Sequence, residues 1–124
     1  MERYIYLGRV LSITDGDTVT LDLDLGCNVH IIERCRLFGI NTPETFGVKK
    51  DSAEYKAGMV AKEWLEDRVE CYPGTEGIEV TVRTHKDKKG KYGRYLVEIF
   101  DGENSINEEM VEKGLAVEYD GGKR

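Results

Sequence analysis

Cysteine and histidine are both scarce in this chain of 124 residues, which contains three cysteines and two histidines. The cysteines Cys27, Cys35 and Cys71 form no CxxC pair, so the sequence indicates neither a zinc site nor a disulfide framework. Cys35 lies in an apolar stretch and is expected to be a buried free thiol, which favours a reducing compartment. Because neither histidine is near the polar motifs described below, a mechanism based on histidine is not indicated.

Long apolar runs are also missing. None approaches the length of a membrane-spanning helix, and charged residues interrupt the N-terminal segment too often for a signal peptide. We therefore expect a cytoplasmic protein with no membrane contact, or a secreted one whose leader has been removed. The length predicts a single domain, residues 1–124, with one modest core.

Positive charge is in deficit, with 18 Lys and Arg against 24 Asp and Glu, giving a formal net charge of −6. Such a balance argues mildly against tight, nonspecific binding of nucleic acid. Residues 85–94 reverse it locally, since they hold Asp87 alone among Lys86, Lys88, Lys89, Lys91 and Arg94. Two interpretations stay open: a basic ridge that holds an anionic substrate briefly, and a solvated hairpin loop, which charge alone favours.

Alternating apolar residues predict five β-strands. The clearest is 18–25, with Thr18 facing outward and Val19, Leu21, Leu23 and Leu25 inward. Gly8 indicates a bulge or bend in the first strand, and Asp15-Gly16 indicates the first hairpin turn. The five predicted strands are residues 4–14, 18–25, 29–38, 78–83 and 95–100.

Two helices are predicted between and after these strands. Asp51 with Glu54 forms a capping box for the first, and Gly58 within it costs about 1 kcal/mol relative to Ala, which indicates a close contact. Ser105 with Glu108 forms a second capping box. The inward stripe of the first helix is predicted to be Ala53, Ala57, Val60, Ala61 and Trp64.

The second helix is expected to end at about Lys113, with Gly114 as the residue after its end. Residues 115–119 are then expected to form a short extended tail, and residues 120–124 to fray. From the pattern alone, this order of elements indicates a small α+β or barrel domain.

Three short polar segments carry the candidate chemistry. Residues 15–18, Asp-Gly-Asp-Thr, supply two carboxylates at a turn. Residues 35–44 run from an apolar strand, which carries Arg36, into a turn that carries Asn41, Thr42 and Glu44. Residues 91–94, Lys-Tyr-Gly-Arg, add a second arginine. Each has an ordinary interpretation as turn chemistry or a surface pair. Together they hold the groups that phosphodiester hydrolysis needs: oxygens for a hard cation, a base for water and arginines for phosphate.

In this order, and followed by Asn107-Glu108 and Gly114-Leu115-Ala116, these segments resemble the staphylococcal nuclease (thermonuclease) family. Each motif alone is weak, but the combination is specific and spans most of the chain. The resemblance selects a five-stranded OB-fold barrel with two helices. The best-known members continue into a third, C-terminal helix, so we expect a different cover for that part of the barrel here, such as a partner subunit. A monomer and a weak dimer both stay open.

The resemblance implies a Ca2+-dependent nuclease that cleaves DNA and RNA with little sequence preference and leaves 3′-phosphate ends. It implies that Asp17, Asn41 and the backbone carbonyl of Thr42 hold the metal, with Asp15 acting through water at most. Family members usually carry aspartate at the position of Asn41. The asparagine removes one negative charge, which predicts weaker Ca2+ binding or loss of metal-dependent activity.

The same resemblance assigns Arg36 and Arg94 to the phosphate, where a planar guanidinium matches two oxygens. Glu44 would be the general base that accepts a proton from the attacking water. Lys91 and Tyr92 would contact substrate phosphate and sugar.

The alternative from another class is a catalytically weak or inactive OB-fold module that binds nucleic acid without cleaving it. Asn41 favours this alternative, whereas Arg36, Glu44 and Arg94 together favour the enzyme, because a binding module needs no carboxylate aimed at a phosphate. Tyr119 is a weaker candidate for base stacking, since the tail around it differs from the family. The sequence does not distinguish DNA from RNA as the preferred substrate.

Overall fold

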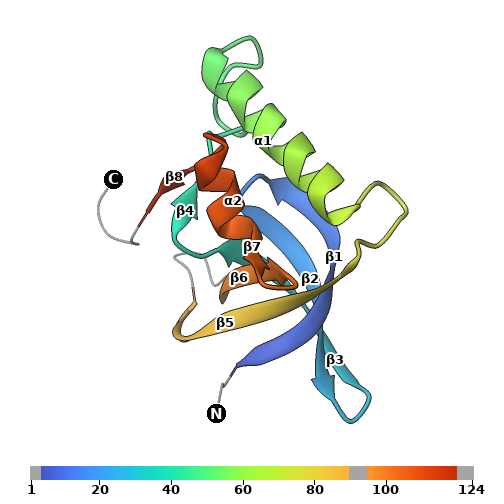
Figure 1. Ribbon diagram of the computed structural model, residues 1–124. Helices are drawn as coiled ribbons and strands as arrows, with labels where there is room; N and C mark the ends of the chain where they lie inside the picture. Colours follow the sequence, from blue (N-terminus) through green and yellow to red (C-terminus); the bar gives the residue numbers. More distant parts are fainter. Residues whose placement is uncertain (1–3, 90–94, 120–124) are drawn as a thin grey trace.

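Five long strands form the body of the molecule in the computed structural model, which describes residues 4–89 and 95–119 (Figure 1). The side chains of residues 86–89 are outside this description, and so are the expected fraying of 120–124 and the loop motif at 91–94. The long strands are β1 (Ile5–Asp15), β2 (Thr18–Gly26), β3 (Val29–Leu37), β5 (Glu79–Lys89) and β6 (Tyr95–Asp101).

Short elements link and cover these strands. They are β4 (Ile40–Asn41), β7 (Asn104–Ser105), β8 (Val117–Glu118), helix α1 (Ala53–Val69) and helix α2 (Ile106–Glu112). The strand boundaries agree with the predicted ones, except that β5 continues six residues further, to Lys89. Among the described residues, no helix is long and apolar enough to cross a membrane.

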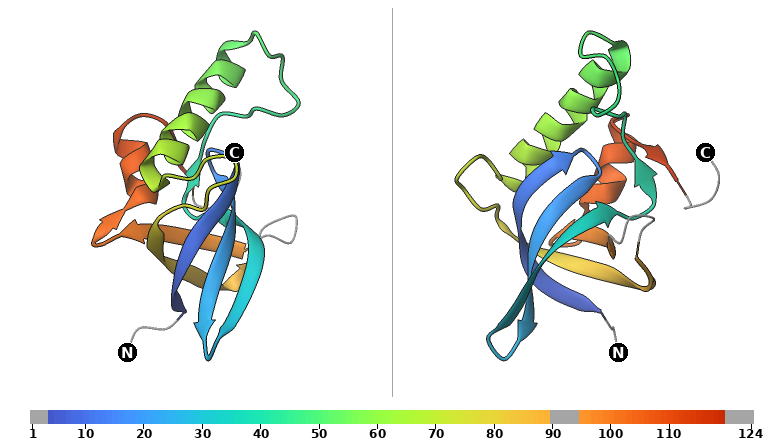
Figure 2. Two further views of the ribbon diagram at one scale, coloured as in Figure 1. Left: turned by 90° about the vertical axis from the view of Figure 1, so that its right-hand side faces the viewer. Right: turned by 180° about the vertical axis from the view of Figure 1, so that it is seen from behind.

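The strands close into a barrel. Neighbours in the order β3-β2-β1-β5-β6 pair in antiparallel fashion. The barrel closes where Cys35–Leu37 of β3 pairs in parallel with Tyr95–Val97 of β6. Five strands closed in this way, with helices at one end of the barrel, confirm the OB-fold prediction (Figures 1 and 2).

The core is made of the inward-facing residues of every long strand, joined by residues from both helices. Each large aliphatic side chain removed from water there contributes about 1.5–3 kcal/mol before the entropy cost of ordering it. Cys35 is among the buried residues and is a free thiol, as expected. The largest fully buried side chains include Leu21, Leu37, Leu65, Ile99, Ile106 and Met110.

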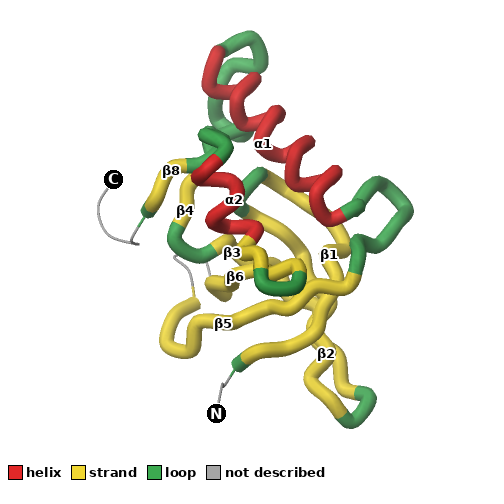
Figure 3. The backbone as a smooth tube through the Cα atoms, in the orientation of Figure 1, coloured by secondary structure: helices red, strands yellow, loops and turns green. Residues whose placement is uncertain are grey.

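The alternation of β2 breaks down at both of its ends. Leu25 is 40% exposed, because the β2–β3 hairpin extends past the barrel and has no core beneath its tip (Figure 3). Thr18 is buried, whereas we predicted that it would face outward. The turn before it is enclosed, since a Cβ on Gly16 would lie 2.9 Å from the Thr42 side chain and 3.0 Å from Ala61.

Two predictions about glycine positions in β1 were also inexact. Gly8 is paired in regular register with Leu23 and Val80, and the bulges of β1 lie further along the strand. The glycine instead permits a close approach, because a Cβ there would be 2.9 Å from the Asp22 carbonyl oxygen. The hairpin turn is Gly16-Asp17, one residue later than predicted, since Asp15 still pairs with Thr18.

Helix α1 begins one residue later than predicted and presents a different stripe. Ser52, not Asp51, is the N-cap, and its hydroxyl accepts a 3.1 Å hydrogen bond from the backbone N–H of Tyr55. Val60 is 54% exposed, and Ala53 and Ala57 are exposed as well, so the predicted stripe is wrong at three of its five positions. The helix is rotated so that Gly58, its smallest residue, faces the segment against which the helix packs. The buried residues of the helix are Gly58, Ala61, Leu65 and Val69.

Gly58 marks a close contact, as predicted. A Cβ at this position would lie 2.6 Å from the carbonyl oxygen of Pro43 and 2.7 Å from the Thr45 side chain. The glycine therefore allows the segment that carries Glu44 to pass directly under the helix.

Helix α2 has the predicted caps. The Ser105 hydroxyl accepts a 3.2 Å hydrogen bond from the N–H of Glu108. At the other end, Gly114 has a φ of +74°, and the Leu115 N–H donates to the Met110 carbonyl at 2.9 Å. This is the pattern of a Schellman motif.

The segment after α2 was predicted to be an extended tail and is in fact a strand. β8 pairs antiparallel with β4, so that Asn41 lies opposite Val117. The pairing is continued by the Tyr119 N–H, which donates to the Gly39 carbonyl at 2.8 Å. The C-terminal described residues therefore hold the strand that carries Asn41.

Candidate active site

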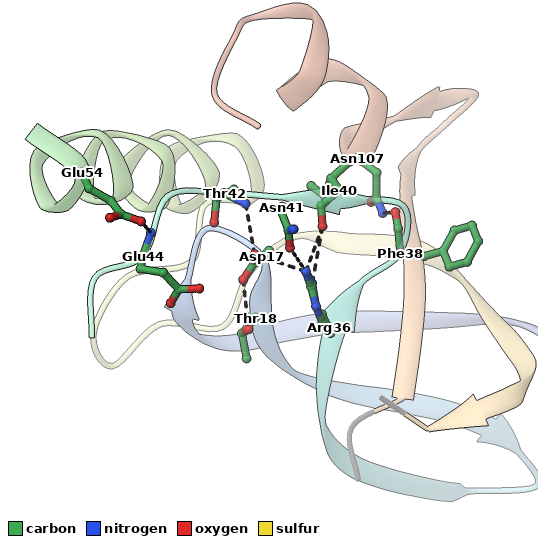
Figure 4. Close-up of polar contacts among 10 residues, drawn as sticks. All are labelled: Asp17, Thr18, Arg36, Phe38, Ile40, Asn41, Thr42, Glu44, Glu54 and Asn107. Atoms are coloured by element: carbon green, nitrogen blue, oxygen red, sulfur yellow. Dashed lines mark hydrogen bonds and ion pairs between the residues drawn. The ribbon is translucent and has the colours of Figure 1, made fainter. Parts of the chain in front are cut away.

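Asp17 joins the β1–β2 turn to the β3–β4 segment. Its backbone carbonyl accepts a 2.8 Å hydrogen bond from the N–H of Leu37. Its carboxylate Oδ2 accepts a 3.1 Å hydrogen bond from the N–H of Thr42 (Figure 4). Two segments that are 25 residues apart in sequence therefore meet at one carboxylate.

Arg36 lies at the centre of the polar cluster, with its side chain 15% exposed. Its Nη2 donates to the Asn41 side-chain oxygen and, at 3.2 Å, to the Ile40 carbonyl, and lies 3.8 Å from Asp17 Oδ2. The guanidinium carbon is also 5.3 Å from the centre of the Tyr119 ring, which is a cation–π distance. Contacts from several directions fix this cation before any ligand arrives.

Asn41 is 93% buried, with 7% of its surface exposed, and its orientation follows from its partner. A guanidinium has only N–H donors, so the amide atom that faces Arg36 must be the oxygen. An asparagine has one such oxygen, whereas a carboxylate has two. Any cation at this site would have to share the amide oxygen with Arg36.

Thr42 contributes both a buried hydroxyl and a backbone carbonyl. The residue is 4% exposed, and its Oγ1 has no hydrogen-bond partner among the described residues. Buried polar atoms are normally satisfied, so an orphan of this kind calls for an explanation. Its position between the β1–β2 turn and α1 places it beside the Asp17 carboxylate.

Glu44 is exposed and follows directly after Pro43 (Figure 4). Its backbone N–H donates to Glu54 Oε2 at 3.3 Å, so the carboxylate of the first turn of α1 holds the loop rather than completing a capping box. Figure 4 shows the Glu44 carboxylate pointing toward Asp17. Asp15, the weaker metal candidate, accepts a hydrogen bond from the Thr45 hydroxyl on the same loop.

The structure thus brings six of the predicted site residues to one end of the barrel, namely Asp15, Asp17, Arg36, Asn41, Thr42 and Glu44. Arg94, Lys91 and Tyr92 lie outside the described residues. Their loop connects β5 to β6, and β6 is the strand that pairs with the Arg36 region of β3.

The donor atoms at this corner are oxygens, the kind of ligand that a hard cation binds. Asp17 offers a carboxylate, Asn41 an amide oxygen and Thr42 a carbonyl, which are the oxygen ligands that Ca2+ accepts. Within the described part of the chain, no group of three or more His, Cys, Asp or Glu could hold a metal ion. An ion at this corner would have one charged ligand, the Asp17 carboxylate, and otherwise neutral oxygens, and the Thr42 hydroxyl without a partner is a further polar atom beside it.

Asn107 is a residue whose role sequence reasoning missed. It is 2% exposed, its Oδ1 accepts from the Ile99 N–H at 3.1 Å, and its Nδ2 donates to the carbonyls of Phe38 at 2.9 Å and Val97 at 3.2 Å. One side chain therefore joins α2, β6 and the turn that leads to β4. The sequence pointed to this asparagine only as part of the Asn107-Glu108 motif, with no role for its side chain.

Arg68 forms a second set of side-chain contacts that join secondary-structure elements near the site. Its guanidinium forms two hydrogen bonds to Glu109, at 2.8 and 3.1 Å, and a 2.8 Å ion pair with Asp101. These contacts raise the pKa of Arg68 above its ordinary value. They connect the end of α1 to α2 and β6, which fixes the helix under which Glu44 passes.

A recess of about 240 Å³ lies on a separate face of the barrel. Its lining is mainly acidic, so it suits no phosphate-bearing substrate. It is lined by Leu7, Gly8, Arg9, Asp22, Asp24, His30, Glu76 and Glu79, none of which belongs to the candidate site.

Comparison with known proteins agrees with the fold. The family model described as staphylococcal nuclease homologue matches residues 34–123. The chain is 29% identical over 108 residues to the thermonuclease of Staphylococcus hyicus, covering 87% of this chain and 56% of that protein. It is 31% identical over 107 residues to the thermonuclease of Staphylococcus intermedius, covering 86% and 56%.

An uncharacterised protein of Methanocaldococcus jannaschii is 28% identical over 132 residues, covering 92% of this chain and 59% of that protein. The chain belongs to the staphylococcal nuclease family, as the family match shows and the closed barrel supports. The chain spans less than two thirds of the length of the curated relatives it matches.

Proposed function

We propose that the protein is a nuclease that hydrolyses phosphodiester bonds of DNA and RNA with little sequence preference. The observation that carries this proposal is the single network in which Asp17, Arg36 and Asn41 meet, with Glu44 directed toward it. This network supports the proposal because it combines a guanidinium held by several partners with side-chain oxygens at one corner of the barrel, and the exposed Glu44 carboxylate is directed toward that corner. The two staphylococcal relatives are named thermonucleases, which supports the same activity.

Arg36 would bind the scissile phosphate. Its orientation is already set by Asn41 and the Ile40 carbonyl, so little reorganisation is needed when a phosphate oxygen approaches. Preorganised donors of this kind stabilise the charge that grows on phosphorus-bound oxygens as water attacks. Arg94 would add a second guanidinium, and Lys91 and Tyr92 would contact the phosphate and sugar.

Glu44 would accept the proton of the attacking water. Its exposure gives water access, and the Glu54 hydrogen bond to its backbone holds the loop in place. The attack would be in line with the leaving 5′-oxygen, so that the phosphate stays on the 3′-oxygen of the other fragment.

Asp17, Asn41 and the Thr42 carbonyl would hold a Ca2+ ion, with Asp15 acting through water. When bound, such an ion supplies Lewis-acid polarisation of a phosphoryl oxygen. Because Arg36 already uses the Asn41 oxygen, we propose that binding of the ion is weak and improves when a nucleotide phosphate is present.

The second candidate is a nucleic-acid-binding module with little or no cleavage. The observation in its favour is that the sole side-chain oxygen of Asn41 faces Arg36. It would keep the phosphate contact of Arg36 while lacking metal-assisted chemistry.

A cleavage assay separates the two. Heat-denatured DNA is incubated at mildly alkaline pH with Ca2+, with Mg2+ or with chelator, using the parent and Glu44→Gln. The nuclease predicts Ca2+-dependent fragments whose rate falls about 100-fold or more in Glu44→Gln. Glu103→Gln is the matched control, because Glu103 is exposed in the β6–β7 turn. Retention of DNA on a low-salt gel without any cleavage by the parent would favour the binding module.

A further inference from the structure

Phe38 is an aromatic residue at the surface beside the candidate site, and it is stacked on a second ring. Its ring centroid lies 3.6 Å from that of His85, with 13° between the ring planes. His85 therefore covers one face of the Phe38 ring, yet Phe38 is still 41% exposed. The exposed area belongs to the parts of the residue that His85 does not cover, and among the described residues no other ring is stacked on Phe38.

The backbone under this ring is fixed on both sides. The Phe38 N–H donates to the Val97 carbonyl at 2.7 Å, and the Phe38 carbonyl accepts from the buried Asn107 amide at 2.9 Å. Scattered exposed hydrophobic residues are ordinary at protein surfaces. Phe38 differs from these, because the peptide groups on both sides of it are hydrogen-bonded and His85 covers one face of its ring. Such a ring loses little conformational entropy when another ring stacks on its other face.

Phe38 also lies at a defined distance from the proposed phosphate ligand. Phe38 is the turn residue directly after β3, and Arg36 lies two residues earlier in that strand, so their Cα atoms are at most about 7 Å apart. Figure 4 shows the Phe38 ring projecting beyond Arg36, on the side away from Asp17 and Thr42. A nucleotide whose phosphate is near Arg36 can place its base on this side.

We propose that the open face of Phe38, supported by His85, is a stacking subsite for one unpaired nucleobase next to the phosphate held by Arg36. The ring offers no hydrogen-bonding pattern, so it accepts every base through its π-face and discriminates little by sequence. A base within a duplex has both faces covered by its neighbours. The subsite therefore selects single-stranded nucleic acid, and this inference rests on the proposed function.

The test measures binding in chelator, where no cleavage is expected. The probes are a fluorescein-labelled hexamer of deoxythymidine and a labelled hexamer of the same phosphate charge in which every base is absent. Fluorescence anisotropy gives the Kd of each for the parent, Phe38→Leu and Phe38→Trp. Tyr72→Leu is the matched control, because Tyr72 is 44% exposed in the turn after α1 and outside the cluster.

Stacking of one base is worth enough to predict a loss of about 5- to 100-fold in affinity for the deoxythymidine hexamer in Phe38→Leu. Phe38→Trp should bind at least as tightly as the parent, Tyr72→Leu should equal it, and the base-free hexamer should bind all four proteins alike. Equal affinity of Phe38→Leu and parent for deoxythymidine would overturn the subsite, as would an equal loss on the base-free hexamer. Circular dichroism confirms that each variant is folded. If Phe38→Leu does not fold, Phe38→Trp still tests the subsite, since weaker binding of the deoxythymidine hexamer by this larger ring would contradict it.

The outcome is separable from that of the proposed function. A parent that cleaves denatured DNA but shows no effect of Phe38 would keep the nuclease and remove the subsite. A parent that never cleaves but loses affinity in Phe38→Leu would keep the subsite and favour the binding module.

Discussion

The side-chain oxygen of Asn41 accepts a hydrogen bond from Nη2 of Arg36, so one atom connects the proposed metal corner to the proposed phosphate ligand. An aspartate there would have a second oxygen and a negative charge. The asparagine keeps the arginine in place but offers the cation only a shared, neutral oxygen. The balance between catalysis and simple binding depends on this pair.

Asn41→Asp is expected to strengthen Ca2+ binding by about tenfold or more, because a charged ligand replaces a neutral one. Isothermal titration calorimetry, with and without a nucleoside bisphosphate, measures the change. Asn104→Asp, at an exposed position in β7, adds the same charge elsewhere and should have little effect. Equal Ca2+ affinity of Asn41→Asp and parent would contradict the proposed ligand set.

Gly58→Ala is expected to destabilise the protein, although the same change in an open helix stabilises it by about 1 kcal/mol. The new Cβ would be 2.6 Å from the Pro43 carbonyl oxygen, a backbone atom that cannot move alone. We expect a loss of about 1–3 kcal/mol in the free energy of unfolding, measured by urea denaturation. The reverse change at the neighbouring exposed position, Ala57→Gly, should cost only about 1 kcal/mol.

Asn107→Ala is expected to cost about 2–4 kcal/mol, because it removes the partner of the Ile99 N–H and of the Phe38 carbonyl in a buried place, while the Val97 carbonyl keeps the Phe38 N–H. Asn104→Ala, exposed in β7, serves as the control with an effect below about 0.5 kcal/mol. Thermal unfolding followed by circular dichroism gives both values. A matching, small effect at the two positions would show that the Asn107 contacts contribute nothing to stability.

Burial raises the pKa of the Cys35 thiol to about 12. In the unfolded chain the thiol ionises near its ordinary pKa of 9.0, so folding disfavours the thiolate. The contribution of Cys35 to stability is therefore complete below about pH 9 and decreases as the pH rises toward 12. Cys35→Ala should show a smaller decrease in stability between pH 8 and pH 10.5 than the parent, measured by urea denaturation. An identical slope would exclude this linkage.

The strands were predictable because their alternation is local, and so were the caps of α2, which depend on Ser105 and Gly114 alone. The rotation of α1 about its axis was not predictable, because two rows of apolar residues on the helix could each face the core. The close contact of Gly58 with Pro43 decides which row does. The β4–β8 pairing was equally hidden, because two-residue strands carry no periodicity.

At the candidate site, sequence motifs indicated which residues gather but not how they pair. The hydrogen bond from Arg36 to Asn41 depends on the turn through Gly39, whose φ is +81°, and on the clamp by Asn107. The stack of Phe38 on His85 joins residues 47 positions apart and leaves no trace in either segment. Long-range packing of this kind is set by the closed barrel and is absent from any short window of sequence.

The most direct test of the account is hydrolysis of single-stranded DNA by the parent in Ca2+ and water enriched in oxygen-18, followed by mass spectrometry of the fragments. We predict that each cut gives one 3′-phosphate that holds one labelled oxygen and one 5′-hydroxyl without label, because Glu44 activates water and the 5′-oxygen leaves. No fragments, or label in a 5′-phosphate, would contradict it.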